Sequence, residues 1–278
     1  MPATILAEIA ERRRGAIAER RKAFASGLPP RPTAFGPARL GAFRRALARG
    51  VNGPAGGATP LRLLCEIKKA SPSKGVIRAD FDPDKLAAGY RAGGAAALSV
   101  LTEPHYFQGD PSYLTRARAT SGLPCLLKDF VIDPWQLDEA VSLGADAVLL
   151  IVALLPLERL DSLVRQARMR GLDTLVEVHT DAELDLALAV GGDLIGINNR
   201  DLTTFEVDPG VTLALRSRIP AGVTVVSESG IATAEDIQRL TRARVDAALI
   251  GEAFMREADV AAAVRRLVDA ARATAQAS

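Results

Sequence analysis

The 278-residue chain has few of the side chains that form disulfides or bind transition metals. It contains two cysteines, Cys65 and Cys125, and two histidines, His105 and His179. Both cysteines lie in apolar segments, which indicates small core residues in a reducing compartment and argues against a disulfide framework. No cysteines and histidines stand at the spacing of metal ligands, which excludes a structural zinc site. Acidic residues are not grouped either, so divalent-metal chemistry is not expected.

Aromatic residues are also few, and neither positive nor negative charge is in large excess. Aromatics make up 4% of the chain and the formal net charge is +2. A dedicated nucleic-acid binder needs a strongly basic surface, often with aromatic stacking platforms, so that class is excluded. The first 50 residues do have a local basic excess, but acidic residues interleave with it, which favours a solvated helix face. The basic residues are Arg12, Arg13, Arg14, Arg20, Arg21 and Lys22.

Long hydrophobic segments are missing as well. The longest apolar run, residues 147–155, is too short to cross a bilayer. Acidic residues near the start and the lack of an apolar segment there argue against a targeting peptide. We therefore expect a soluble, cytoplasmic protein that binds neither membranes nor nucleic acid.

The order of apolar residues divides the chain into a helical start and a repeating remainder. Apolar residues recur near helical spacing between residues 5 and 24, and a second short helix is predicted for residues 38–48. The Gly/Pro-rich residues 52–60 are typical of a linker. We expect an N-terminal helical extension over residues 1–50 and a catalytic barrel domain over residues 51–278.

Eight apolar segments of strand type follow, each separated from the next by a segment with helix start and stop residues. Continuous apolar strands alternating with helices predict an all-parallel sheet with both faces covered. Eight such units favour an α/β fold of the (β/α)8 TIM-barrel type. An open doubly wound sheet is the alternative, but no GxGxxG follows the first strand. The predicted strands are residues 61–67, 96–101, 124–127, 147–152, 174–178, 194–197, 223–226 and 247–250.

Polar residues follow nearly every predicted strand. The carboxyl ends of barrel strands carry function, and so many charges beside buried strands are costly to desolvate. Function is therefore favoured over a purely structural use of the set, although the Glu66–Lys68 pair alone fits a surface ion pair equally well. In chain order the strand ends carry Glu66 and Lys68, then Ser99, Thr102 and Glu103, then Lys128, Asp129 and Phe130, then Glu177 and His179, then Asn198, Asn199 and Arg200, then Ser227, Glu228, Ser229 and Gly230, and finally Gly251 and Glu252.

Lys128 and Glu177 are the best acid–base candidates, because they leave the third and fifth strands and can converge on one ligand across the barrel mouth. We expect Lys68 and Arg200 to lower the pKa of Lys128 toward working pH, which suits a general acid. The Glu177 carboxylate beside these cations would stay ionised and could act as a base. For His179 a supporting hydrogen bond is favoured over catalysis.

The last two strand ends resemble the phosphate site of a barrel enzyme. Ser229 and Gly230 follow the seventh strand, and Gly251 follows the eighth. Small residues there let backbone N–H groups approach a phosphate. The alternative is that the glycines only form tight turns, but two such loops at these two strands favour phosphate binding.

Seven segments, one at nearly every strand end, together form a recognisable series. They read EIKKASPSKG (66–75), LSVLTE (98–103), LKDF (127–130), VEVH (176–179), GINNRDL (196–202), SESGI (227–231) and IGE (250–252). In this order the series resembles the motifs of the indole-3-glycerol phosphate synthase family. The resemblance covers essentially the whole chain and includes the helical extension.

The resemblance implies a carbon–carbon carboxy-lyase of tryptophan biosynthesis. Its substrate would be 1-(2-carboxyphenylamino)-1-deoxy-D-ribulose 5-phosphate, which closes a ring and loses CO2 and then water to give indole-3-glycerol phosphate. No cofactor and no metal are implied. The expected partner is this phosphorylated small molecule, and the expected state is a monomer.

The resemblance also implies a role for each site residue. Lys128 would be the general acid that protonates the ribulose carbonyl oxygen, and Glu177 the base paired with it. Lys68 would contact anionic groups of the substrate and serve as a second proton donor. The other implied roles are orientation by Glu66 and Asn198, contact with the anthranilate carboxylate by Ser71 and Arg200, an aromatic wall of Phe107 and Phe130, a further polar contact from Glu228, and phosphate binding by Ser229, Gly230, Gly251 and Glu252. Because some relatives have Ser where Glu252 stands, only the backbone N–H of Glu252 is assigned to the phosphate.

Two other functions remain open at this point. Phosphoribosylanthranilate isomerase is a phosphate-binding barrel that would need a Cys and an Asp at strand ends, whereas Cys65 precedes Glu66 and faces the opposite side. A non-catalytic ligand-binding barrel would keep its full effect after Lys128→Met.

Overall fold

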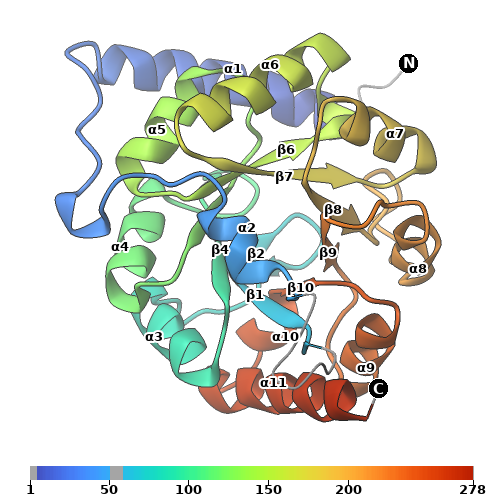
Figure 1. The fold of residues 1–278 in the computed structure, drawn as a ribbon. Coiled ribbons are helices and arrows are strands. Elements are labelled where there is room, and N and C mark those ends of the chain that lie inside the picture. Colours follow the sequence, from blue (N-terminus) through green and yellow to red (C-terminus); the bar gives the residue numbers. More distant parts are fainter. Residues whose placement is uncertain (1–4, 51–58, 278) are drawn as a thin grey trace.

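Eight parallel strands close into a barrel, which confirms the predicted (β/α)8 architecture (Figure 1). The computed structural model describes residues 5–50 and 59–277. The first strand pairs with the second barrel strand on one side and with the last on the other, so the ring has no free edge. The barrel strands are β1 (Arg62–Ile67), β4 (Ala97–Leu101), β5 (Cys125–Lys128), β6 (Ala147–Ile151), β7 (Asp173–Val178), β8 (Leu194–Asn198), β9 (Thr224–Glu228) and β10 (Ala247–Ile250).

Helices surround the ring, and several begin where the sequence carries cap residues. The Asp82 carboxylate accepts the N–H of Asp84, and Thr233 forms a capping box with Asp236. The helices after the strands are α3 (Pro83–Gly93), α4 (Pro111–Ser121), α5 (Trp135–Leu143), α6 (Leu157–Met169), α7 (Asp181–Ala189), α8 (Gly210–Arg216), α9 (Ala234–Arg242), α10 (Glu252–Met255) and α11 (Val260–Gln276). Shorter elements not expected from the sequence are η1 (Thr33–Phe35), η3 (Val152–Leu154) and a small hairpin of β2 (Ala70–Ser71) and β3 (Gly75–Val76) in the loop after β1.

Side chains of the barrel strands alternate between the barrel interior and the helices outside. In β1, for example, Leu64 belongs to the interior cluster, whereas Leu63 and Cys65 belong to the cluster under the helices. A residue two positions after an interior residue therefore lies above it, at the barrel mouth. This register brings four strand-end side chains to one place, since Glu66 follows Leu64, Lys128 follows Leu126, Glu177 follows Leu175 and Glu228 follows Val226.

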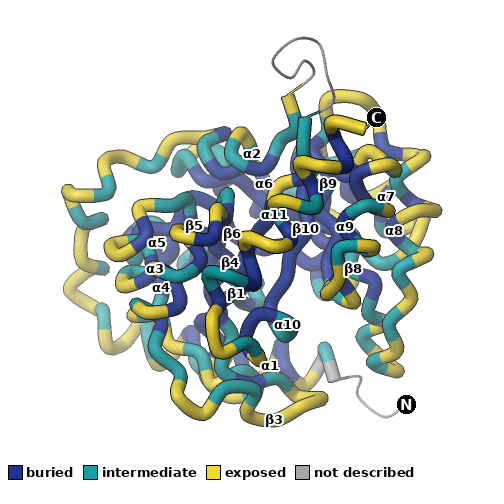
Figure 2. The backbone as a smooth tube through the Cα atoms, turned by 90° about the horizontal axis from the view of Figure 1, so that it is seen from below, coloured by how far each residue is buried: buried dark blue, intermediate teal, exposed yellow. Residues whose placement is uncertain are grey.

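The N-terminal segment runs between the two ends of the barrel. It contains α1 (Ile5–Ala23) and α2 (Ala42–Leu47), the second being shorter than the predicted helix over 38–48. In α2, Phe43 and Leu47 are fully buried in the interior cluster, so this helix closes the amino-terminal end of the barrel (Figure 1). Figure 2 shows α2 and the hairpin strand β3 at opposite ends of the molecule. Most of the predicted linker over 52–60 lies outside the described residues.

Aspartates at the starts of barrel strands hold this segment in place. Asp173 accepts the backbone N–H groups of Gly41 and Arg44, at 2.6 and 2.9 Å, and Asp246 accepts that of Arg49 at 3.0 Å. Asp146 pairs with the guanidinium of Arg31 at 3.2 Å. Asp173 and Asp246 thus accept backbone donors of the N-terminal segment and Asp146 pairs with its guanidinium, so these contacts stabilise the end of the barrel opposite the strand-end charges.

The prediction that the basic residues of α1 form a solvated face is wrong for Arg13. Its side chain is buried, with 5% of the residue exposed, whereas Arg12 and Arg14 are exposed. None of the helices in the two described ranges combines the length and the apolar character that crossing a membrane requires.

Candidate active site

A cavity of about 560 Å³ opens at the carboxyl ends of the barrel strands. Its volume is in the range of small-molecule binding sites. Every residue to which the family resemblance assigns a role lines it: Glu66, Lys68, Ser71, Phe107, Lys128, Phe130, Glu177, Asn198, Arg200, Glu228, Ser229, Gly230, Gly251 and Glu252. The barrel therefore gathers into one cavity residues that are spread over nearly 190 positions of sequence.

The Lys128 ammonium group lies between two buried carboxylates. Its Nζ donates to Glu228 Oε2 at 2.6 Å and to Glu177 Oε2 at 3.2 Å. The other oxygen of Glu177 accepts from Asn198 Nδ2 at 3.2 Å. Because β5 and β9 lie four strands apart around the ring, the Lys128–Glu228 contact spans the barrel mouth. Such charge-assisted hydrogen bonds in a buried site fix the position of the amine.

The expectation that neighbouring cations lower the pKa of Lys128 is wrong. Burial by itself lowers the pKa of this amine, but the carboxylates of Glu228, Glu177 and Glu66 outweigh burial and raise it above its ordinary value. Arg200 makes its hydrogen bond elsewhere: its Nη1 donates to the carbonyl oxygen of Phe205 at 2.9 Å. Lys128 is therefore fully protonated in the free protein.

The two carboxylates beside Lys128 differ in their acidity. Burial raises the pKa of both, but for Glu177 the charges of Lys128 and His179 outweigh burial and lower the pKa, so this carboxylate is ionised at neutral pH. Glu228 has a pKa raised to about 7, because burial and the negative charge of Glu177 outweigh the attraction of Lys128. Its Oε1 is buried and has no hydrogen-bond partner among the described residues.

A second ion pair lies on the other side of the mouth. Lys68 Nζ is 2.7 Å from Glu66 Oε2, and Ser99 Oγ donates to Glu66 Oε1 at 3.4 Å. Burial would raise the pKa of Glu66, but the charges of Lys68 and Lys128 outweigh it and keep the pKa below its ordinary value. The side chains of Glu66 and Lys68 are 4% and 18% exposed, so this pair is buried at the cavity wall and is not a surface ion pair.

His179 lies behind Glu177 and does not line the cavity. Its Nδ1 is 3.0 Å from Glu183 Oε2, and its Nε2 is 3.5 Å from Glu177 Oε1. Burial lowers the pKa of the imidazole, but the hydrogen bond to Glu183 and the charge of Glu177 outweigh it and raise the pKa. This geometry fits the support role expected from the sequence.

Backbone approaches the cavity closely after β9 and β10. Ser229 and Gly230 have φ angles of 67° and 72°, in the left-handed region. A Cβ on Gly230 would lie 2.5 Å from Val207 Cγ1, and one on Gly251 would lie 2.4 Å from Glu66 Oε2, so neither site accepts a larger residue without movement. The Glu252 carboxylate pairs with Arg256, at 2.9 Å, and Glu252 is one of the cavity-lining residues.

An apolar wall completes the cavity. The rings of Phe107 and Phe130 are 6.2 Å apart and tilted, which is within the range of favourable aromatic pairs. Leu6 and Ile9 of α1 also line the cavity. The sequence did not single out these two, because their helical spacing predicts an apolar face without showing what it covers.

Within the described ranges, no group of three or more His, Cys, Asp or Glu side chains is placed to hold a metal ion.

Comparison with known proteins identifies the family. The family model described as "Indole-3-glycerol phosphate synthase" matches residues 6–267, which is nearly the whole chain. The chain belongs to the indole-3-glycerol phosphate synthase family. The activity of this family is ring closure, decarboxylation and dehydration of 1-(2-carboxyphenylamino)-1-deoxy-D-ribulose 5-phosphate, and the chain is therefore a carboxy-lyase of tryptophan biosynthesis.

Individual members of the indole-3-glycerol phosphate synthase family are similar over most of their length. The protein of that name from Aromatoleum aromaticum is 53% identical over 205 residues, covering 74% of this chain and 78% of the relative. Those from Chromobacterium violaceum and Rhizorhabdus wittichii are 52% and 51% identical, covering 74% and 75% of this chain and 77% and 79% of the relatives.

Solved structures of lower similarity share the fold alone. The 3-hexulose-6-phosphate synthase of Salmonella typhimurium has a TM-score of 0.62 at 15% identity, over 77% of this chain and all of that one. A chain of the tryptophan synthase complex of Pyrococcus furiosus has a TM-score of 0.56 at 16% identity, over 75% of this chain and 98% of that one.

Proposed function

We propose that the cavity at the barrel mouth is the catalytic site and that Lys128 and Glu177 carry its proton transfers. The observation that supports this most directly is the contact of Lys128 Nζ with Glu177 at 3.2 Å and Glu228 at 2.6 Å inside the cavity. A proton donor and a proton acceptor then face the same bound molecule, as general acid–base catalysis requires.

In this proposal Lys128 protonates the ribulose carbonyl oxygen as the ring closes. The raised pKa of Lys128 keeps the amine protonated, which is the state that a donor must have before the step. When the amine gives up its proton, the adjacent carboxylates lose their counter-charge. Glu228, whose pKa of about 7 lies near working pH, is placed to take up a proton and limit that cost.

Glu177 is the base of the dehydration half of the reaction. Its lowered pKa keeps it ionised, and Asn198 fixes its orientation through the 3.2 Å hydrogen bond. We assign orientation of the substrate hydroxyls to Glu66 and Asn198, and a second proton-donor role to Lys68, whose Nζ is held by Glu66 at 2.7 Å.

The remaining lining residues define where the substrate lies. We propose that its aromatic ring packs against Phe107 and Phe130, with the anthranilate carboxylate near Ser71 and Arg200. The phosphate would lie at the opposite end, where small residues expose backbone N–H groups: Ser229, Gly230, Gly251 and Glu252. Fixing both ends of the molecule holds the reacting atoms together, which lowers the entropic part of the barrier.

We also propose that residues 1–50 are an extension added to a barrel domain of residues 51–278, with α1 covering the mouth and α2 closing the other end. Leu6 and Ile9 at the cavity, and Phe43 and Leu47 in the barrel interior, support this division of tasks. The expected monomeric state and cytoplasmic location stay predictions. Size-exclusion chromatography with light scattering tests the former, and fractionation of the source cells tests the latter.

A fluorescence assay of indole-3-glycerol phosphate formation tests the catalytic assignment. Lys128→Met is expected to lower kcat by about 10²–10⁴-fold, because it removes the proton donor but keeps the length of the side chain. Lys85→Met is the matched control, since Lys85 is exposed on α3 outside the barrel. Wild-type turnover in Lys128→Met would contradict the assignment.

A further inference from the structure

Arg13 is buried, unlike the other basic residues of α1: Arg20 and Arg21 also reach out of the helix, to Glu139 and Asp133, but their side chains are 31% and 49% exposed. The side chains of Arg12 and Arg14 are 57% and 64% exposed, and their ion pairs with Glu8 and Glu11 stay within the helix. The side chain of Arg13 is 6% exposed and reaches out of the helix to Asp129, with Nη2 2.6 Å from Oδ2. Exposed pairs within one helix contribute little, whereas a buried pair between distant segments constrains both of them.

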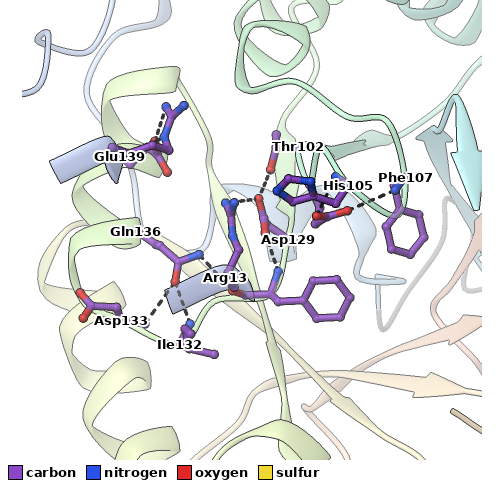
Figure 3. Close-up of polar contacts among 12 residues, drawn as sticks. Arg13, Thr102, His105, Phe107, Asp129, Ile132, Asp133, Gln136 and Glu139 are labelled. Carbon is purple, nitrogen blue, oxygen red and sulfur yellow. Dashed lines mark hydrogen bonds and ion pairs between the residues drawn. The ribbon is translucent and has the colours of Figure 1, made fainter. Parts of the chain in front are cut away.

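Asp129 is fully engaged by the surrounding residues (Figure 3). Its Oδ2 accepts from Arg13 and also from Thr102 Oγ1 at 2.6 Å, and its Oδ1 accepts the backbone N–H of Phe130 at 2.7 Å. The carboxylate side chain is 1% exposed. Burial raises the pKa of Asp129, and the charge of Arg13 is the largest influence that opposes this. Arg13 is therefore the cation that most strongly opposes the effect of burial on this aspartate.

The position of Asp129 in the chain connects α1 to the proposed proton donor. Asp129 directly follows Lys128, the last residue of β5, and directly precedes Phe130 of the cavity wall. The Asp129 carboxylate pairs with Arg13 of α1, and Asp129 also lines the cavity beside Lys128. Because its Oδ1 accepts the backbone N–H of Phe130, the ion pair is tied to the backbone next to Lys128.

We propose that Arg13 is a positioning residue for the reaction: its ion pair with Asp129 fixes the end of β5 so that Lys128 Nζ lies between Glu177 and Glu228. The proposal rests on the role of Lys128 given above. It assigns to α1 a contribution to turnover that is separate from the coverage of the cavity by Leu6 and Ile9. Arg13 acts through Asp129 and does not itself touch the substrate, since it is not among the cavity-lining residues.

The test is a set of variants assayed for kcat, KM and thermal unfolding midpoint. Arg13→Met is expected to lower kcat by about 10–100-fold with KM changed less than about threefold, because a displacement near 1 Å at the reacting group costs that much. Arg13→Lys, which keeps the charge, should recover part of kcat. The double variant Arg13→Met/Asp129→Asn should lose far less than the product of the two single losses, because both changes break one interaction.

Arg14→Met is the matched control and should keep the wild-type kcat, since Arg14 is exposed and pairs only with Glu11. If Arg13→Met does not fold, Arg13→Gln, which keeps a donor, is assayed in its place with the same expectation. A folded variant with wild-type kcat, a loss confined to KM, or losses that multiply fully in the double variant would overturn the proposal. Failure of the Lys128 assignment is recognised separately, by full turnover in Lys128→Met.

Discussion

Replacing Glu228 by glutamine tests the charge balance of the site through the pH dependence of stability. Glu228 is the buried carboxyl whose pKa is raised to about 7, and its Oε2 holds Lys128 at 2.6 Å. Glutamine has the same shape and cannot ionise. The wild type and Glu228→Gln should therefore differ by an amount that changes with pH, while most other contributions to stability cancel.

The sign and size of this change follow from the two pKa values. Between about pH 4.5 and 7 the unfolded chain releases the Glu228 proton while the folded protein retains it, so stability falls as the pH rises, and the loss is complete above about pH 7. A carboxyl pKa raised from 4.5 to about 7 corresponds to about 3 kcal/mol, most of which is lost between pH 5 and 8.

Urea unfolding followed by circular dichroism at pH 5 and pH 8 measures the difference. Relative to Glu228→Gln, the wild type should lose about 2–3 kcal/mol between the two pH values. Glu177→Gln is a control of opposite sign. Because the pKa of Glu177 is lowered in the folded protein, its ionised carboxylate stabilises the fold at any pH above the ordinary pKa of a glutamate. The stability of the wild type relative to Glu177→Gln should therefore not fall as the pH rises. A wild-type minus Glu228→Gln difference that stays constant to within about 0.5 kcal/mol would refute the raised pKa of Glu228.

Two further predictions concern the supports of the site. In Gly196→Ala the new Cβ would lie 2.2 Å from Glu228 Oε1, so the carboxylate that holds Lys128 must shift. We expect kcat to fall about 10–100-fold with an unchanged circular dichroism spectrum, and a normal kcat would mean that Glu228 does not hold Lys128. Removing residues 1–23 should leave a folded barrel with raised KM, since α1 lines the mouth, and with lowered kcat, since the Arg13–Asp129 pair is lost. Removing residues 1–50 also takes away Phe43 and Leu47, each comparable to a core truncation of about 2–5 kcal/mol, and should lower the urea midpoint sharply. Equal midpoints for the two truncations would contradict the role given to α2.

The barrel could be predicted from sequence because its strands are apolar runs of the correct length and spacing, and the observed strands begin and end within two residues of the predicted ones. The cavity could be predicted because alternation along a strand and the carboxyl-end rule place Glu66, Lys128 and Glu177 together. Both arguments depend only on the spacing and alternation of residues that are close in the sequence, and these can be read from the sequence.

The charges that face one another across the mouth could not be predicted in the same way. Which side chain meets Lys128 depends on distances across the ring, so Glu228 was named only as a further polar contact and Arg200 was wrongly given an influence on the amine. The buried Arg13 was missed for a similar reason. Three successive arginines at 12–14 point in three directions around a helix, and only the position of α1 against β5 decides which of them is buried.

The long-range contacts of the N-terminal segment limit when it can pack during protein synthesis. Arg13, Gly41 and Arg49 leave the ribosome well before their partners Asp129, Asp173 and Asp246, the last of which follows 197 positions after Arg49. At roughly 5–20 residues per second this interval is about 10–40 s. The nascent amino-terminal segment therefore waits, with Phe43 and Leu47 unburied, until the final strand has been synthesised and can complete the ring.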